Sequence, residues 1–552
     1  MSENLGSLSG RKGLQENLFE KLGTAAENSG TVSTGELEAL RREYLFGKAS
    51  LFGTVSFYDF MKPANKGKKV YVCNGSACLT AGTQEELRQK LGTRFTEEET
   101  GEICCLGRCH ENSAFQTGGI NYSGSDIRDI DTLLKNDQPE EDSYPVTLLE
   151  DSVFNSPAAF QGEYYSLLSD CLRHSREHLL QELKLSGLRG RGGAGFPMAF
   201  KLEACMNAAS ATKFIVCNAD EGDPGAYSDR YIMEKQPHAL LLGMMIAGYI
   251  AGAATGVIYI RAEYPESVNR IRDAIVTLEN EGWLGDHIKG TQFSFQFKMI
   301  KAQGAYICGE ETALLSSIEG QRPEVRVRPP YPAQSGLFNQ PTLVNNVETL
   351  ACLPYIFKQG ASAFKTIGTK ASAGTKLISL DGHFNKPGIC EVPMGTPLST
   401  VIYETGGGFK SKIKALHIGG PLGGLIPVHK IPELTVDFES FRNAGFLLGH
   451  ASIVCIPESF PMIRYLEHLF RFTAHESCGK CFPCRLGSVR GYEMLEKAQQ
   501  ENYKIDPVLM KDLLDTLEKG SLCALGGGLP LPVKNALAYF KDELQGYFMT
   551  SD

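Results

Sequence analysis

Positive charge is scarce in this chain, which carries 55 Lys and Arg against 64 Asp and Glu among its 552 residues. The net charge is therefore −9, and no segment forms the basic stripe that nucleic-acid-binding proteins present to phosphates. We expect no nucleic-acid partner. No internal repeat is evident either, which argues against a repeat architecture.

Apolar runs at the N-terminus are also lacking. Residues 1–22, MSENLGSLSGRKGLQENLFEKL, have no apolar stretch after their charges, so we expect no secretory signal and a cytoplasmic, reducing location. One uncharged segment, ALLLGMMIAGYIAGAATGVIYI at 239–260, is long enough to cross a bilayer. The sequence AATG at 253–256 would end a helix, and the run that follows is typical of a buried strand. We therefore predict a helix followed by a core strand, and no transmembrane segment.

Cysteines are plentiful, and they cluster. In a reducing compartment clustered thiols are more often metal ligands than disulfides. The segment ESCGKCFPCR places Cys478, Cys481 and Cys484 three apart, and Cys523 follows at a distance. A close triplet with a remote fourth thiolate is typical of a [4Fe–4S] site, whereas structural zinc more often uses pairs.

A second cysteine group lies nearer the N-terminus. Cys73 and Cys78 occur in VCNGSACLTAG, and Cys105 and Cys109 occur in EICCLGRCH, each pair after a short apolar run. Two loops that each offer two thiolates can meet around zinc or a [2Fe–2S] cluster, and spacing alone leaves both open. Cys104 is an alternative to its neighbour, but the Leu-Gly that follows Cys105 favours Cys105, because glycine lets the loop wrap closely.

Linkers and local patterns divide the chain into the segments of an α/β multidomain protein. We expect a loose N-terminus to about residue 32 with a helical stretch from about Thr34 to Phe60, together 1–67, then a unit at 68–137, an α/β domain at 150–375, a β-rich insert at 376–450 and a helical segment at 455–552.

The glycine-rich segment SGLRGRGGAGFP (186–197) formally matches G-x-G-x-x-G through Gly190, Gly192 and Gly195. The dinucleotide fingerprint requires a preceding strand, however, and the residues before this loop are typical of a helix. Exposed backbone N–H groups, with Arg189 and Arg191, could still bind a phosphate or a flat ring. A flexible turn is the alternative.

Two acidic loops follow segments that we interpret as strands. NADEGDPGAYSDR (218–230) follows FIVC, and GAYICGEET (304–312) places Gly309 before Glu310 and Glu311. Loops at the carboxyl ends of strands are where α/β sheets bind ligands. Carboxylates at a helix start can also be purely structural caps, which remains an alternative for the second loop.

Taken together, GRGGAGFP, NADEGDPG, GAYICGEET, PTLVNNVET and ESCGKCFPCR resemble, in the same order, motifs of the NADH-oxidising flavoprotein of respiratory complex I. They resemble equally the diaphorase subunits of NAD-linked formate dehydrogenases and soluble hydrogenases. The resemblance covers about 160–552. Residues 68–137 resemble that family's thioredoxin-like [2Fe–2S] domain, 376–450 its β-grasp-like insert, and 455–552 its helical [4Fe–4S] domain.

The resemblance implies an FMN site, an NAD(H) site and two clusters. It places FMN against Gly190, Arg191, Gly192, Gly193, Ala194, Lys201, Asn218, Asp220, Glu221, Tyr306, Gly309, Glu310, Val344, Asn345, Asn346 and Thr349. It places NADH against Phe196, Tyr331, Lys201, Glu311 and Arg328. Cys73, Cys78, Cys105 and Cys109 would hold [2Fe–2S], and Cys478, Cys481, Cys484 and Cys523 would hold [4Fe–4S]. No acid or base catalyst is implied, because the flavin carries the chemistry.

The implied function is hydride transfer between NADH and FMN, with single electrons passing through the clusters to or from a partner catalytic or iron–sulfur subunit. Asp223, Ala204, Arg328 and Tyr331 depart from the residues usual in the family, and these departures bear on nucleotide affinity. Two alternatives remain. Electron-bifurcating relatives extend into further cysteine motifs, whereas no Cys or His follows Cys523. The second alternative is a scaffold protein that relays electrons between clusters without nucleotide turnover.

Overall fold

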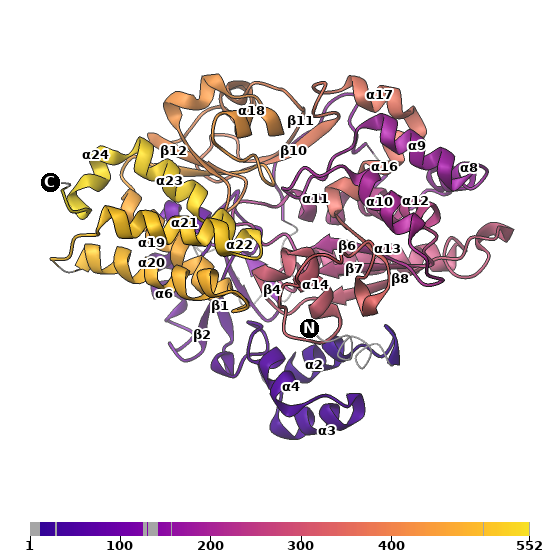
Figure 1. Ribbon diagram of the computed structural model, residues 1–552, viewed down its shortest axis with the longest axis horizontal. Coiled ribbons are helices and arrows are strands. Elements are labelled where there is room, and N and C mark those ends of the chain that lie inside the picture. The colour runs from indigo at the N-terminus through magenta and orange to yellow at the C-terminus, as the bar shows by residue number, and fades with distance from the viewer. Residues whose placement is uncertain are drawn as a thin grey trace.

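The computed structural model describes residues 12–27, 30–124, 130, 142–155, 157–500 and 502–550. Figure 1 shows the yellow C-terminal helices on one side, the orange β-rich part at the top and the indigo N-terminal helices at the bottom. The α/β part, in magenta, lies opposite the C-terminal helices. The boundary expected near 137 lies outside the described residues.

A four-stranded parallel sheet lies at the centre of the α/β part, in the order β8-β7-β6-β9. Its strands are β6 (Phe214–Ala219), β7 (Thr255–Ile260), β8 (Gln296–Lys301) and β9 (Thr342–Asn346). The strand order reverses between β6 and β9, because β7 and β8 extend the sheet one way from β6 and β9 pairs on its other side. Such a reversal opens a crevice at the carboxyl ends of the strands, where α/β sheets bind ligands.

Helices flank this sheet. They are α8 (Gly162–Cys171), α9 (Arg176–Ser186), α10 (Met198–Asn207), α11 (Ser228–Lys235), α12 (Pro237–Ala251), α13 (Pro265–Asn280), α14 (Glu311–Ile318), α15 (Val347–Ala351), α16 (Leu353–Gln359) and α17 (Ala361–Thr366). Of these, α12 is buried and apolar on nearly all sides.

The long apolar segment forms α12 and β7, as predicted. Gly252, at φ +76°, ends the helix in the left-handed conformation that glycine adopts without strain. Both elements are buried in the core. Among the described residues, we find no helix with both the length and the apolar character needed to span a membrane.

The first cysteine group belongs to a small four-stranded sheet in the order β2-β1-β3-β4. Its elements are β1 (Val70–Cys73), α5 (Ser76–Ala81), α6 (Gln84–Leu91), β2 (Thr100–Ile103), β3 (Phe115–Thr117) and β4 (Ile120–Tyr122). β1 pairs with β2 in parallel and with β3 antiparallel.

The β-rich part is a six-stranded mixed sheet in the order β13-β12-β14-β10-β11-β5. Its elements are β5 (Val146–Thr147), β10 (Thr375–Leu380), β11 (Gly388–Pro393), β12 (Ile413–Ile418), β13 (Gly424–Pro427), α18 (Phe438–Asn443) and β14 (Ser452–Pro457). The sheet therefore recruits β5 and β14 from outside the expected insert at 376–450. β14 lies between β10 and β12, so it is a central strand.

The C-terminal part is helical after β14. It contains α19 (Met462–Glu476), α20 (Phe482–Gln500), α21 (Pro507–Gly520), α22 (Ala524–Gly528), α23 (Pro530–Tyr539) and α24 (Lys541–Leu544).

The N-terminal segment is more ordered than expected. Helix α2 (Leu18–Glu27) lies within the stretch that we expected to be loose, and it buries Leu18 and Leu22 against the main body. The expected helical stretch from about Thr34 to Phe60 contains two helices, α3 (Thr34–Tyr44) and α4 (Lys48–Val55). Ser33 is the N-cap of α3, and with Glu36 it forms a capping box.

Candidate flavin and iron–sulfur sites

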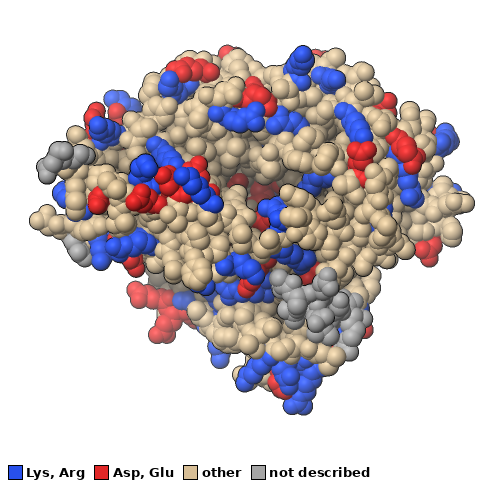
Figure 2. Space-filling view, viewed as in Figure 1, with Lys and Arg blue, Asp and Glu red and all other residues tan. Residues whose placement is uncertain are grey.

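A cavity of about 380 Å³ lies at the carboxyl ends of β6 and β9. Its walls come from the glycine loop, the two acidic loops, the β-rich part and the start of α22. It is lined by Gly192, Gly193, Ala194, Asn218, Asp220, Glu221, Gly222, Asp223, Asp229, Tyr306, Ile307, Gly309, Glu310, Asn346, Gly419, Leu422, Leu447, Gly449, His450, Ala524 and Leu525. Figure 2 shows a hollow near the middle of the face, with acidic atoms deep inside it and Lys and Arg around it.

The glycine loop lies over the end of β9. The Arg191 backbone N–H donates to Thr349 Oγ1 (2.8 Å), which holds the loop against α15. A Cβ placed on Gly192 would lie 2.9 Å from Asn346 Cβ, so only glycine leaves the wall open there. Gly193 has φ +123°, which a side-chain-bearing residue rarely adopts.

Two asparagines mark the crevice where the strand order reverses. Asn218 on β6 and Asn346 on β9 are direct partners in the parallel register, and both line the cavity. Asn218 Nδ2 donates to the Gly309 carbonyl (2.7 Å), and Asn346 Oδ1 accepts from the Thr349 backbone N–H (3.3 Å). These bonds position both amides at the rim of the sheet.

The first acidic loop buries its carboxyl groups at the cavity wall. Glu221 accepts the backbone N–H groups of Asp229 (2.9 Å) and Arg230 (3.0 Å), so it caps α11. Burial raises the pKa of Glu221 to about 7. Asp223 accepts the Tyr306 hydroxyl (2.7 Å), and burial raises its pKa as well.

The second acidic loop follows β8, which ends at Lys301, but the residues directly before Glu310 do not form the strand that we expected there. Tyr306–Gly309 is a 3₁₀ turn (η5), because Ala305 and Glu310 are extended and the chain between them bends back. Glu310 is the N-cap of α14 and accepts the Thr312 and Ala313 backbone N–H groups, each at 2.9 Å. It also lines the cavity, so the same side chain caps α14 and faces the candidate ligand site.

Glu311 is the centre of a chain of ion pairs beside the cavity. Lys201 Nζ lies 2.7 Å from one carboxylate oxygen, and Arg328 Nη1 lies 3.2 Å from the other. Lys201 also donates to the Val344 carbonyl (2.8 Å). These residues are outside the cavity lining, as are two exposed aromatics, Phe196 and Tyr331.

Several residues that the resemblance placed at the flavin lie behind the lining. The Arg191 guanidinium is fully buried and donates to the Ala373 carbonyl (2.5 Å). The others in this position are Gly190, Val344, Asn345 and Thr349. Conversely, the sequence analysis did not predict ten of the lining residues. These are Gly222, Asp229, Ile307, Gly419, Leu422, Leu447, Gly449, His450, Ala524 and Leu525. Their neighbours in sequence carry no motif, with two exceptions. Gly222, Asp229 and Ile307 lie within the two acidic loops, and Ala524 and Leu525 directly follow Cys523.

Unsatisfied polar atoms around the cavity fit a polar ligand. Asp220 Oδ2, Asp229 Oδ1, Asn345 Nδ2 and His450 Nδ1 are buried and have no hydrogen-bond partner within the described part of the chain. Buried polar groups without partners are costly, and a flavin, with ring carbonyls, an imide N–H and ribityl hydroxyls, offers complementary atoms. The residues present therefore fit FMN.

The first thiol group gathers Cys73, Cys78, Cys105 and Cys109. Cys105 Sγ and Cys109 Sγ are 3.5 Å apart, and a hydrogen bond from Cys78 lowers the pKa of Cys73 to about 7. The Gly225 backbone N–H donates to Cys109 Sγ (3.2 Å). Such a buried tetrathiol fits a metal centre, because the cation and backbone N–H groups would stabilise the thiolates.

The second thiol group lies where the chain enters α20 and α22. Burial raises the pKa of Cys484 to about 11 and of Cys523 to about 12, and each thiol interacts electrostatically with Cys478. Ser477 Oγ lies 3.3 Å from Cys484 Sγ. All sixteen cysteines of the chain lie in described segments, and none is in a disulfide. The triplet and Cys523 thus fit an iron–sulfur cluster.

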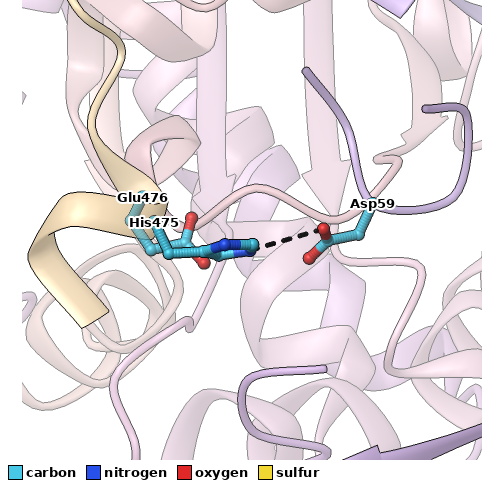
Figure 3. Close-up of side chains that lie close together, drawn as sticks. All are labelled: Asp59, His475 and Glu476. Carbon is cyan, nitrogen blue, oxygen red and sulfur yellow. Dashed lines mark ion pairs between the residues drawn. The ribbon is translucent and has the colours of Figure 1, made fainter. Parts of the chain in front are cut away.

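His475 and Glu476, just before the triplet, connect the C-terminal helices with the N-terminal segment and the α/β part. Figure 3 shows the first of these contacts, between His475 and Asp59. His475 Nε2 lies 3.6 Å from Asp59 Oδ1 of the N-terminal segment, and Glu476 accepts the Tyr306 backbone N–H (2.9 Å). The Lys62 ammonium already pairs with the Asp59 carboxylate. We therefore interpret Asp59, His475 and Glu476 as part of an ion-pair network instead of a metal site.

Three family models match the chain. Residues 183–355 match the Nuo51 FMN-binding domain, 464–547 the NADH-ubiquinone oxidoreductase-F iron–sulfur binding region, and 8–138 the thioredoxin-like [2Fe–2S] ferredoxin. With the fold and the cavity, these matches define an α/β flavin and iron–sulfur oxidoreductase subunit.

Individual relatives narrow the family. An NADH-quinone oxidoreductase subunit of Rhizobium meliloti is 40% identical over 69% of this chain and 91% of its own length. The NAD-reducing hydrogenase HoxS subunit alpha of Cupriavidus necator is 34% identical over 89% of this chain and 85% of its own. A crystal structure of an NAD⁺-reducing NiFe hydrogenase in the air-oxidized state matches with a TM-score of 0.84 and 26% identity, over 97% of this chain and 94% of that chain.

The chain belongs to the family of NADH-oxidising flavin and iron–sulfur subunits shared by NADH-quinone oxidoreductases and NAD-reducing hydrogenases. It is a diaphorase-type oxidoreductase subunit, and its cofactors are FMN, a [4Fe–4S] cluster and a [2Fe–2S] cluster, with NAD(H) as the nucleotide. The family predicted from the sequence motifs is confirmed.

Proposed function

We propose that this chain exchanges electrons between NAD(H) and a partner catalytic subunit of the hydrogenase or formate dehydrogenase type, through both of its clusters. The observation that carries this proposal is that both thiol groups border the flavin cavity. The loop 218–225 lines the cavity at Asp223 and two residues later donates to Cys109 Sγ. Cys523 directly precedes Ala524 and Leu525, which also line the cavity.

Bound FMN would supply the chemistry that couples two-electron hydride transfer from NADH to one-electron transfer toward iron–sulfur clusters. The chain's own residues bind and orient the flavin and the nucleotide. We assign the flavin to the cavity between the glycine loop and the two acidic loops, and the nucleotide to the side where Lys201, Glu311 and Arg328 form their ion pairs. Phe196 and Tyr331 are exposed there at 48% and 55%, and so are available for stacking.

The helical [4Fe–4S] segment offers an apolar surface to a partner. Phe482, Leu486 and Val489 follow one another on one face of α20 and are exposed at 68%, 58% and 40%. Leu522, beside Cys523, is 42% exposed. Contiguous exposed apolar side chains mark interaction surfaces, and their place beside the thiols supports docking of the next electron carrier here.

The hydrogenase relatives support the choice of partner, since they are named as NAD- or NADP-reducing hydrogenases. The NADP-reducing hydrogenase subunit HndC of Solidesulfovibrio fructosivorans is 40% identical over 69% of this chain and 78% of its own length. We propose a cytoplasmic location, which the free state of all sixteen cysteines supports, because reducing compartments keep thiols unpaired.

Two measurements test the proposal. The purified chain should oxidise NADH with an artificial dye acceptor, since the flavin and nucleotide sites lie within one chain. Absence of this activity in protein with full flavin and iron content would support the scaffold alternative instead. Co-purification with its partners, followed by analysis for nickel, molybdenum and tungsten, identifies the partner. A complex without any of the three metals would contradict both a nickel-containing hydrogenase and a formate dehydrogenase as the partner.

A further inference from the structure

The flavin cavity is acidic, although FMN is an anion. Five carboxyl side chains line it: Asp220, Glu221, Asp223, Asp229 and Glu310. Among the lining residues, all of which the structure describes, His450 is the one basic side chain. A phosphate carries about −1.5 to −2 charges at neutral pH, so such a lining by itself would repel it.

His450 is held at the cavity wall by two carboxylates of the acidic loop and α11. Its Nε2 lies 3.3 Å from Asp229 Oδ2 and 3.7 Å from Glu221 Oε1, and its side chain is 6% exposed. Its Nδ1 has no hydrogen-bond partner in the described structure. The loop that carries His450 packs closely against the backbone at Gly419, since a Cβ on Gly449 would lie 2.4 Å from the Gly419 carbonyl oxygen.

The surrounding charges favour the imidazolium form. Asp229 and Glu221 raise the pKa of His450 to about 9 despite its burial, and Lys376 opposes them. Lys376 on β10 is itself paired with Glu348 on α15, and Asp223 of the acidic loop also interacts electrostatically with His450. His450 is therefore charged at neutral pH and becomes neutral as the pH rises through about 9.

We propose that protonated His450 supplies the positive charge that allows this acidic cavity to accept the phosphate-bearing flavin, FMN. The inference rests on the proposed flavin site and goes beyond it by naming a residue outside every motif of the chain. In a buried site of low dielectric, one charge acts over the whole cavity. His450 would discriminate FMN from riboflavin, which has the same ring and ribityl chain but no phosphate.

The test measures binding of FMN and of riboflavin to the flavin-depleted full chain. In the wild type, the FMN dissociation constant should rise by up to about tenfold from pH 8 to pH 10, which is the largest change that loss of one proton with a pKa of about 9 can produce over this range. Riboflavin affinity should change much less over this range. Glu221, with its pKa near 7, is already ionised at pH 8, so it does not account for the change.

The His450→Gln variant should bind FMN about ten- to hundredfold more weakly than the wild type at pH 8. It should lose the steep pH dependence and keep its riboflavin affinity. His417→Gln is the matched control: His417 is a buried histidine on β12 of the same six-stranded sheet, and burial lowers its pKa to about 4, so it carries no charge. It should leave the preference for FMN intact.

Three outcomes would overturn the inference while leaving the flavin site in place. These are a wild-type FMN affinity that is flat from pH 8 to pH 10, equal loss of FMN and riboflavin in His450→Gln, and an unchanged FMN affinity in that variant. If the variant does not fold, the wild-type pH series alone decides. Binding of neither flavin at any pH would instead refute the proposed cavity.

Discussion

The missing side chain at Gly192 keeps the cavity open beside Asn346. A Cβ there would meet Asn346 Cβ at 2.9 Å, and valine adds two further methyl groups. We expect Gly192→Val to weaken FMN binding about tenfold or more, since overpacking costs typically ~1–3 kcal/mol. The ratio of flavin absorbance to protein absorbance after purification measures how much FMN each variant retains. Gly35→Ala on α3, where a Cβ meets nothing within 4 Å, should retain full flavin; equal flavin in both variants would contradict the assignment.

Glu311 should favour NADH over NADPH, because a carboxylate hydrogen-bonds a ribose diol and repels a 2′-phosphate. In the structure, the Glu311 carboxylate also forms ion pairs with two cations, Lys201 and Arg328. Glu311→Gln removes the repulsion and releases both cations to bind a phosphate. We expect kcat/KM for NADPH relative to NADH to rise about tenfold, the scale of one charge-assisted contact.

Steady-state kinetics with both nucleotides checks this prediction. Glu203→Gln, which loses only an ion pair with Lys184 (2.7 Å) between α9 and α10, should leave the ratio unchanged. Equal or better kcat/KM for NADPH in the wild type would overturn the assignment of Glu311.

At the scale of elements, the two thiol groups belong to separate structural units and should lose their clusters separately. Cys481 lies between α19 and α20, far in sequence from β1, α5 and the segment after β2, which carry the other group. The wild type should contain about six irons per chain, from the ligand counts of the two cluster types. Cys481→Ser should retain about two, with the [2Fe–2S] signal still visible by electron paramagnetic resonance. Stoichiometric zinc in place of iron would contradict both assignments.

Cys104→Ser is the control for that experiment. Cys104 neighbours Cys105, but its carbonyl accepts from Arg261 Nη2 (3.0 Å) and its side chain packs against the apolar clusters of the main body. It should keep both clusters. Loss of the [2Fe–2S] signal in Cys104→Ser, with retention in Cys105→Ser, would exchange the two residues in the ligand set.

At the scale of the whole molecule, the N-terminal helices share an apolar cluster with the flavin and [4Fe–4S] parts. Phe19 on α2 is fully buried, and its ring lies 5.0 Å from that of Tyr58 and 6.2 Å from that of Tyr259 on β7. Cys478 and Cys484 belong to the same cluster. Phe19→Ala should lower the free energy of unfolding by ~3–5 kcal/mol and speed iron loss to a chelator.

Denaturant unfolding and the rate of iron release measure these effects. Phe52→Ala on α4 is the matched control, because Phe52 is 57% exposed and its loss should change stability by no more than ~0.5 kcal/mol. A similar small change in Phe19→Ala would show that the N-terminal helices do not depend on this contact.

Local signals predicted much of the fold. The run of apolar residues followed by AATG predicted α12 and β7 because helix and strand formation depend on neighbouring residues, and the spacing of the cysteines predicted two thiol groups for the same reason. The signals failed where packing decides: α2 is amphipathic and orders only because the main body covers its apolar side, and the chain before Glu310 bends into a 3₁₀ turn instead of a strand.

The sequence by itself therefore determined the family and the cofactors, because the residues of each motif lie close together along the chain. Only the tertiary structure decided which distant segments close the cavity. His450 and Gly419 come from the six-stranded sheet, and Leu525 comes from the C-terminal helices. No local pattern distinguishes these residues from core positions. Their proximity to Gly192 arises from the packing of separate sheets and helices, and that packing sets the charge of the proposed flavin site.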